Sequence, residues 1–106
     1  MNKVSIIFVC TGNICRSPTA EAIFKSKIER MGLTDFFLVD SAGTHGYHIG
    51  QSPDQRSVSA AKPYNYSFEG IKSRAFDVSI DYENDYIIAM DQSHLNWLME
   101  NKPSEC

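Results

Sequence analysis

One stretch of this chain decides its fold: residues 4–18, which read VSIIFVCTGNICRSP. Its first seven residues are rich in β-branched and aromatic side chains and predict a strand over Val4–Cys10, centred on Ser5–Val9. A short polar loop follows, and Ser17-Pro18 is typical of the start of a helix. A loop between a strand and a helix presents backbone N–H groups and the positive end of the helix dipole to one point. The stretch therefore predicts an anion site after the first strand.

The loop also carries a nucleophile and a cation at a spacing that suits phosphate. Cys10 ends the strand, where a thiolate can act as the nucleophile, and the planar guanidinium of Arg16 can bind two oxygens. Gly12 and Asn13 tolerate positive φ, which a tight curl of backbone needs. The simpler alternative is a buried cysteine beside a helix-capping arginine. We predict that Cys10 and Arg16 are catalytic and that phosphate contacts Thr11, Gly12, Asn13, Ile14, Cys15, Arg16 and Ser17.

Composition is typical of one small domain, which we expect to cover residues 1–106. The hydrophobic share is 42% and the net charge is −3, so no nucleic acid or membrane partner is predicted. Three cysteines, two of them in one loop, make no disulfide framework, and the three histidines lie in no metal-binding spacing. We expect no metal, no cofactor and a reducing, cytoplasmic location. The chain also lacks G-x-G-x-x-G and Gly-Lys-Ser/Thr, the motifs of nucleotide-binding loops.

Strands and helices alternate along the rest of the sequence. In the first helix, apolar residues from Ala20 to Met31 recur at helical spacing, and Gly32 ends the pattern. The last helix is amphipathic and uses Leu95, Leu98 and Met99. Alternation of this kind implies a parallel sheet with its site at the carboxyl ends of the strands. The expected elements are helix Ser17–Met31, strand Phe36–Ala42, a helix from about Pro53 to Ala61, a buried strand Tyr86–Met90 and helix Gln92–Asn101.

Residues 9–18, VCTGNICRSP, resemble the signature loop of the low-molecular-weight protein tyrosine phosphatases. The resemblance implies a three-layer α/β fold, with a parallel sheet, helices on both faces and a phosphate loop after the first strand. It also implies hydrolysis of phosphotyrosine proteins or small aryl phosphates: Cys10 attacks phosphorus, Arg16 holds the equatorial oxygens, and water hydrolyses the phosphocysteine. The resemblance continues, in the family's order, through residues 20–22, 40–44, 50–54, 73–74 and 89–93.

The same resemblance gives roles to residues around the loop. Asn13 would fix the loop by bonding to Ser17 and Ser41. Tyr47 and His48 would form walls of the slot for the phenyl ring, together with Thr11 and Ile14. For His48 the alternative is a solvated loop residue.

Three residues have roles that follow from their positions in the chain. We expect Ser17 to be the N-cap of the first long helix and to donate its hydroxyl to the Cys10 thiolate. Asp91 is expected to cap the last helix. Cys15 lies in the loop with Cys10, so we predict that it protects Cys10 by forming a disulfide after oxidation.

The sequence also departs from the family pattern. Ile71 stands where the resemblance places a histidine tied to Asn13, so the loop is expected to be less rigidly held. The family continues with a fourth strand, a loop containing Asp-Pro-Tyr and a closing helix, and none of the four prolines here follows an aspartate. We expect the chain to end before that last strand and helix and to lack the general acid. The edge of the third strand would then be uncovered, which favours self-association.

Two further functions stay open at this point. A domain without the general acid could bind phosphate or phosphotyrosine and turn it over weakly. An arsenate reductase-like function is the other alternative, because such enzymes share this fold and loop. That chemistry needs a resolving cysteine, and Cys15 and Cys106 are the remaining candidates.

Overall fold

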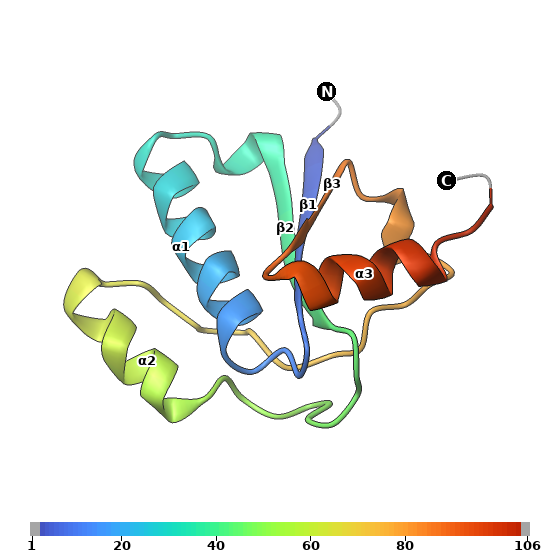
Figure 1. Ribbon diagram of the computed structural model, residues 1–106. Coiled ribbons are helices and arrows are strands. Elements are labelled where there is room, and N and C mark those ends of the chain that lie inside the picture. Colours follow the sequence, from blue (N-terminus) through green and yellow to red (C-terminus); the bar gives the residue numbers. More distant parts are fainter. Residues whose placement is uncertain (1–2, 105–106) are drawn as a thin grey trace.

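The computed structural model describes residues 3–104 as a parallel sheet with helices packed around it (Figure 1). The strands lie in the order β2-β1-β3, and both neighbouring pairs are parallel. This confirms the predicted α/β class. The main elements are β1 (Val4–Cys10), α1 (Arg16–Arg30), β2 (Phe37–Gly43), α2 (Gln55–Ala61), β3 (Tyr86–Ala89) and α3 (Gln92–Asn101), and short 3₁₀ helices occupy Thr34–Phe36, Lys62–Tyr64 and Asp81–Glu83.

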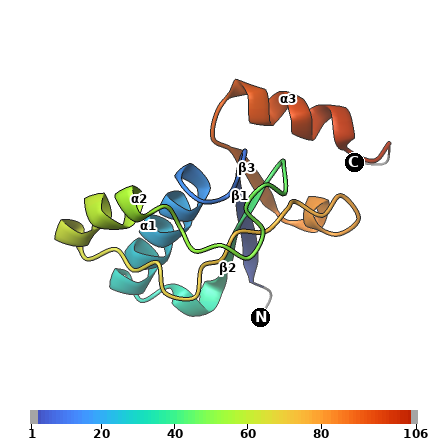
Figure 2. The same ribbon diagram turned by 90° about the horizontal axis from the view of Figure 1, so that it is seen from below.

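The central strand β1 is buried on both faces because different elements cover each side. On one face the ring of Phe8 lies 6.0 Å from that of Phe24 in α1. On the other face Ile7 and Val9 belong to a core that includes Leu98 of α3. Figure 2 shows α1 and α2 together on one side of the strands and α3 away from them. The expected three layers, with helices on both faces, are confirmed.

Register brings the ends of the strands to one edge of the sheet. Cys10 of β1 is opposite Gly43 of β2, and Val9 is opposite Ala89 of β3. The loop after β1 therefore lies beside the segments that leave the other two strands. A site at this edge can draw on residues from across the whole chain.

The predicted helices lie within one or two residues of their observed limits, but their apolar stripes differ. Gly32, at φ 70°, ends α1, and Met31 just before it is 70% exposed rather than packed. In α3, Leu98 is buried as predicted, whereas Leu95 and Met99 are 43% and 55% exposed. The second fully buried residue of α3 is His94. A polar side chain takes that place because it has partners in the loop after β1.

The prediction that β3 is a buried strand is wrong. Ile87 and Ala89 pack against the core, but Tyr86 and Ile88 are 59% and 40% exposed. These two lie on the face of the sheet that α1 covers, and α1 packs mainly across β1 and β2. Within residues 3–104, no strand pairs with the outer edge of β3.

Candidate active site around Cys10

The loop after β1 is anchored at its base by the segment that follows β2. Thr44 N–H donates to the carbonyl of Cys10 at 2.8 Å, and His45 N–H donates to that of Thr11 at 3.0 Å. Asn13 turns the backbone with φ 56°. Within the described part of the chain, the N–H groups of residues 11–15 donate to no protein acceptor. A curl of backbone with unused N–H donors is the arrangement that binds an anion.

Cys10 is buried beneath this loop and contacts a hydroxyl. Its Sγ lies 2.9 Å from Ser17 Oγ. Asn13 Nδ2 donates to the same Ser17 oxygen at 2.8 Å, so the hydroxyl proton of Ser17 is available to Cys10. A donor at this distance stabilises a thiolate. The predicted contact between Ser17 and Cys10 is confirmed.

The prediction that Ser17 is an N-cap is wrong. Helix α1 begins at Arg16, Cys15 takes the cap position, and no side chain caps the helix. Ser17 lies inside the first turn and is fully buried. Its hydroxyl points inward because the network around Asn13 holds it there.

That network ties three parts of the chain to the loop. The second N–H of the Asn13 amide donates to Ser41 Oγ at 2.9 Å, which confirms the predicted pair of bonds. Ser41 in turn donates to the buried carboxylate of Glu21. Arg74 N–H donates to Asn13 Oδ1 at 2.9 Å and so fixes which way the amide faces. Ile71 is buried as an apolar residue, and the Asn13 amide is fully bonded without a histidine there.

Arg16 is held at the outer side of the loop by the start of α3. Its Nη1 donates to Asp91 Oδ2 at 2.7 Å, and half of its side chain stays exposed. Asp91 is the N-cap of α3, as predicted, and accepts from the N–H groups of Ser93 and His94. The side-chain bond from Ser93, followed by that from Arg16, holds the pKa of Asp91 well below its usual range. This carboxylate therefore stays ionised and cannot protonate a leaving group near neutral pH.

His48 lies directly over the loop, whereas Tyr47 stands away from it. A Cβ built on Gly12 would come within 2.8 Å of the His48 ring, so a larger residue at this position would displace that ring. The prediction of positive φ holds for Asn13 but is wrong for Gly12. Tyr47 is 70% exposed and stacks on His45, with ring centres 5.2 Å apart. The two expected wall residues are thus neighbours in sequence with different surroundings.

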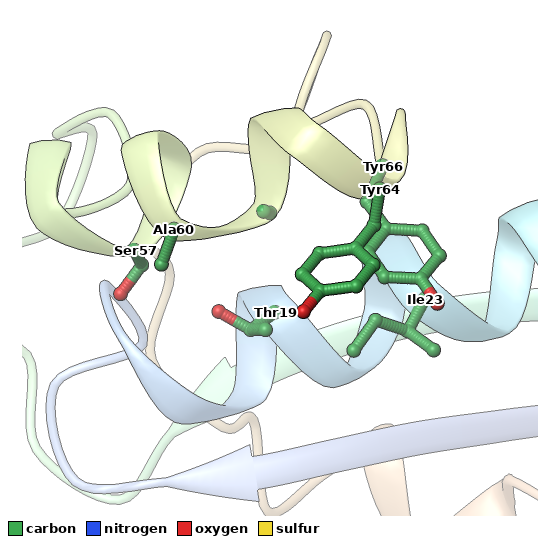
Figure 3. A pocket seen from close by; sticks show the side chains of 7 residues that line it. Thr19, Ile23, Ser57, Ala60, Tyr64 and Tyr66 are labelled. Carbon is green, nitrogen blue, oxygen red and sulfur yellow. The ribbon is translucent and has the colours of Figure 1, made fainter.

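The far side of the loop rests on α2. Asp54 N–H donates to the carbonyl of Ile14 at 2.6 Å, and Cys15 Sγ lies 3.2 Å from Ser57 Oγ. Cys15 is exposed, and Cys106 lies outside the described residues. Beside this contact, a mainly apolar pocket of about 290 Å³ lies between α1 and α2. Figure 3 shows the side chains that line it. The pocket is lined by Thr19, Ile23, Ser57, Ala60, Ala61, Tyr64 and Tyr66, and it is separate from Cys10.

Two further properties of the described residues concern metal binding and membrane-spanning helices. Among residues 3–104, no group of three or more His, Cys, Asp or Glu is placed to bind a metal ion. In the same part of the chain, no helix has the length and apolar character of a membrane span.

Sequence reasoning missed two residues of the site. Glu21 interrupts the apolar side of α1, and a lone acidic residue at a helical core position is a signal that could have been used. His94 gave no such signal, since its partner Thr11 is 83 residues away in the sequence.

Comparison with known proteins places this geometry in context. A family model described as low molecular weight phosphotyrosine protein phosphatase matches residues 5–105. A Saccharomyces cerevisiae protein of that name is 46% identical over 106 residues, or 95% of this chain and 63% of the relative. The structure of a protein tyrosine phosphatase from Entamoeba histolytica matches with TM-score 0.90 and 41% identity, over 97% of this chain and 65% of that one. YfkJ from Bacillus subtilis matches with TM-score 0.90 and 39% identity, over 94% and 63%. The chain thus spans slightly less than two thirds of the length of these relatives.

Proposed function

This chain belongs to the low molecular weight phosphotyrosine protein phosphatase family, and from that membership we propose that it hydrolyses phosphotyrosine in proteins and small aryl phosphates. The observation that carries the proposal is the Cys10 sulfur, buried under a loop with unused N–H donors and 2.9 Å from the Ser17 hydroxyl. The named activities of the relatives belong to proteins about half as long again, so activity of this chain needs its own measurement.

The reaction proceeds in two displacements. In the first, the Cys10 thiolate attacks phosphorus, an S–P bond forms, and the P–O bond to the aryl group breaks to release aryloxide. In the second, water attacks phosphorus, the S–P bond breaks, and inorganic phosphate leaves with the thiolate restored. Ser17 assists the second step most, because its hydroxyl stabilises the sulfur as it becomes negative again.

Arg16 binds the phosphoryl oxygens with the N–H groups that Asp91 leaves unused. A guanidinium has five N–H donors, and the bond to Asp91 occupies one of them. Asp91 therefore orients Arg16 and leaves its other N–H donors unused. The bidentate geometry that suits the equatorial oxygens remains available.

We expect the rate of hydrolysis by this chain to depend strongly on the leaving group of the substrate. Asp91, the carboxylate bonded to Arg16, stays ionised and is no general acid. General acid catalysis contributes about 10²–10⁴-fold, so substrates that need protonation at the leaving oxygen should turn over slowly. An aryl phosphate with an acidic phenol avoids that loss. The alternative function is a domain that binds phosphate or phosphotyrosine and hydrolyses it only weakly.

The test compares p-nitrophenyl phosphate with an alkyl phosphate under single-turnover conditions. We expect measurable release of p-nitrophenol and little or no release of the alcohol. Cys10→Ser should abolish turnover, because the side chain that contacts this position is the Ser17 hydroxyl, which is too weak a base to ionise a serine, yet the variant should still bind inorganic phosphate. Arg16→Lys should lower kcat/KM by about 10- to 100-fold, since a single ammonium replaces a charged two-bond contact. Hydrolysis that survives Cys10→Ser would overturn the assignment of the site.

Two properties of the setting follow from the same chemistry. Cys10 and Cys15 are free thiols, and Cys10 must remain so to act as the nucleophile. We therefore propose a reducing compartment such as the cytoplasm. The proposed partners are phosphotyrosine proteins, and no metal or cofactor enters either displacement.

A further inference from the structure

His94 is a buried titratable residue that the proposed displacements do not use. It lies in the first turn of α3 and is 2% exposed. Its Nε2 is 2.9 Å from the hydroxyl of Thr11, the residue that follows the nucleophile. Buried histidines are costly unless both ring nitrogens find partners, so this placement calls for an explanation.

The partners of the imidazole favour one tautomer. Asp91 N–H donates to His94 Nδ1 at 3.2 Å as one half of the capping box of α3, and Asp91 Oδ1 lies 3.3 Å from the same nitrogen. From the backbone bond we assign the acceptor role to Nδ1. The neutral ring then has its proton on Nε2, which donates to Thr11 Oγ1. Burial is the main cause that lowers the pKa of His94, and nearby Arg16 lowers it further, whereas Asp91 opposes the shift. The ring is therefore neutral at pH 7.

Thr11 is held by His94 through its side chain and by the segment after β2 through its backbone. His45 N–H donates to its carbonyl at 3.0 Å, and Nε2–H of His94 donates to its hydroxyl. With the carbonyl and the side chain both fixed, the peptide planes that open the loop cannot rotate freely. The loop's first N–H donors are oriented before any phosphate arrives.

We propose that His94 is a positioning residue for the phosphate loop, acting through the Thr11 hydroxyl. The proposal rests on the proposed function of the Cys10 site, but it concerns binding of the anion rather than the displacement. The guanidinium of Arg16 also lies near the ring, with Nη2 3.5 Å from Nε2. In the assigned tautomer both nitrogens carry protons, so this contact is van der Waals packing that limits the movement of Arg16 toward α3. The hydrogen bond that holds Arg16 is the one to Asp91.

The test measures the dissociation constant of inorganic phosphate by titration calorimetry at pH 7, without turnover. His94→Leu removes the bond to Thr11, and we expect phosphate binding to weaken by about 2- to 10-fold, the effect of one lost hydrogen bond. Thr11→Val removes the other partner and should weaken binding similarly. The double variant should bind no worse than the weaker single variant, because both substitutions break the same bond.

A rescue variant separates positioning from simple support of α3. His94→Gln can accept from Asp91 N–H and donate to Thr11, so it should bind phosphate as the native chain does. In the hydrolysis of p-nitrophenyl phosphate, KM should follow the same order as phosphate affinity. If His94→Leu fails to fold, Thr11→Val and His94→Gln still decide the matter.

Three outcomes would overturn the inference. Additive losses in the double variant would mean that His94 and Thr11 act separately. Native phosphate affinity in Thr11→Val would remove the proposed route. Failure of His94→Gln to rescue would assign the histidine to packing alone. Absence of hydrolysis by the native chain would instead count against the proposed function and leave the binding test intact.

Discussion

At the scale of single residues, Ser17 and Arg16 are each held by a neighbouring side chain that leaves them hydrogen-bond donors for the proposed reaction. Asn13 donates to Ser17, and this makes the hydroxyl proton of Ser17 available to Cys10. Asp91 takes one donor of Arg16 and leaves the others for a phosphoryl group. In both cases the neighbouring side chain orients the functional group and leaves at least one of its hydrogen-bond donors unused.

Protonation of His94 should make the native state less stable in acid. The pKa of His94 is lowered in the folded chain, so the unfolded chain binds the proton more strongly. The stabilising effect is complete above the unfolded pKa of about 6.5 and is lost as the pH falls below that value. We expect the free energy of unfolding in urea to fall as the pH drops below about 6.5. His94→Gln should remove this step and keep the further loss of stability below about pH 4, which protonation of the carboxylates causes. A step of the same size in His94→Gln would contradict the argument.

Cys15 should protect Cys10 from irreversible oxidation. Peroxide converts the Cys10 thiolate to a sulfenic acid, which condenses with the Cys15 thiol to form a disulfide and release water. Dithiothreitol should then restore activity in the native chain and much less in Cys15→Ser. Bound phosphate should slow the first step, because it occupies the space above Cys10. Ser57→Ala, which alters the contact of Cys15 with α2, is the matched control and should recover fully. Equal recovery in Cys15→Ser would leave Cys15 with a packing role only.

At the scale of elements, β3 combines a functional end with an unprotected edge. Its carboxyl end leads into Asp91, which anchors Arg16 and starts α3. Its outer edge pairs with no strand among residues 3–104, and Tyr86 and Ile88 expose apolar surface beside it. Unpaired edges with apolar side chains promote association between chains.

The chain should therefore self-associate through β3 as its concentration rises. Light scattering after size-exclusion chromatography should show a growing mass, and Ile88→Lys should restore the monomer because a charge on an edge strand opposes pairing. Leu38→Lys on β2, another exposed apolar residue, is the control and should leave association unchanged. A monomer at all concentrations would contradict this prediction.

At the scale of the whole molecule, polar contacts join distant segments of the chain around the loop. Ser73 Oγ donates to the carbonyl of Gly12 at 2.8 Å, and the Arg74 backbone bonds to Asn13. The Arg74 guanidinium binds Asp81 at 2.8 Å and Asp40 at 2.7 Å, and Asp81 is the main cause that raises the pKa of Arg74 above its usual value. The segment after α2 thereby fastens the loop to β2.

Substitution of Asn13 should destabilise the whole fold rather than the loop alone. Asn13→Ala removes the bonds that the amide makes to Ser17 and Ser41 and leaves the Arg74 N–H without its partner, and a buried unsatisfied group costs about 1–3 kcal/mol. Alanine is also strained at φ 56°. Asn13→Gly separates the two effects, because glycine accepts this φ and still lacks the amide. Urea unfolding should rank native above Asn13→Gly above Asn13→Ala. A stability of Asn13→Gly equal to that of the native chain would show that the amide bonds contribute little.

The sequence alone determined the local architecture and the chemistry of the loop. Side-chain periodicity, the positions of glycine and proline, and the spacing of Cys10 and Arg16 are set within a few residues. The elements could therefore be predicted, and Cys10 could be proposed as the nucleophile. Only the tertiary structure decided which face of β3 is covered, why Ser17 points inward, and that His94 bonds to Thr11 and Asp91 to Arg16. The last two pairs are separated by 83 and 75 residues, and they meet because the parallel register places the ends of β1 and β3 together. Local patterns carry no record of such contacts, since packing between distant elements, rather than backbone propensity, selects them.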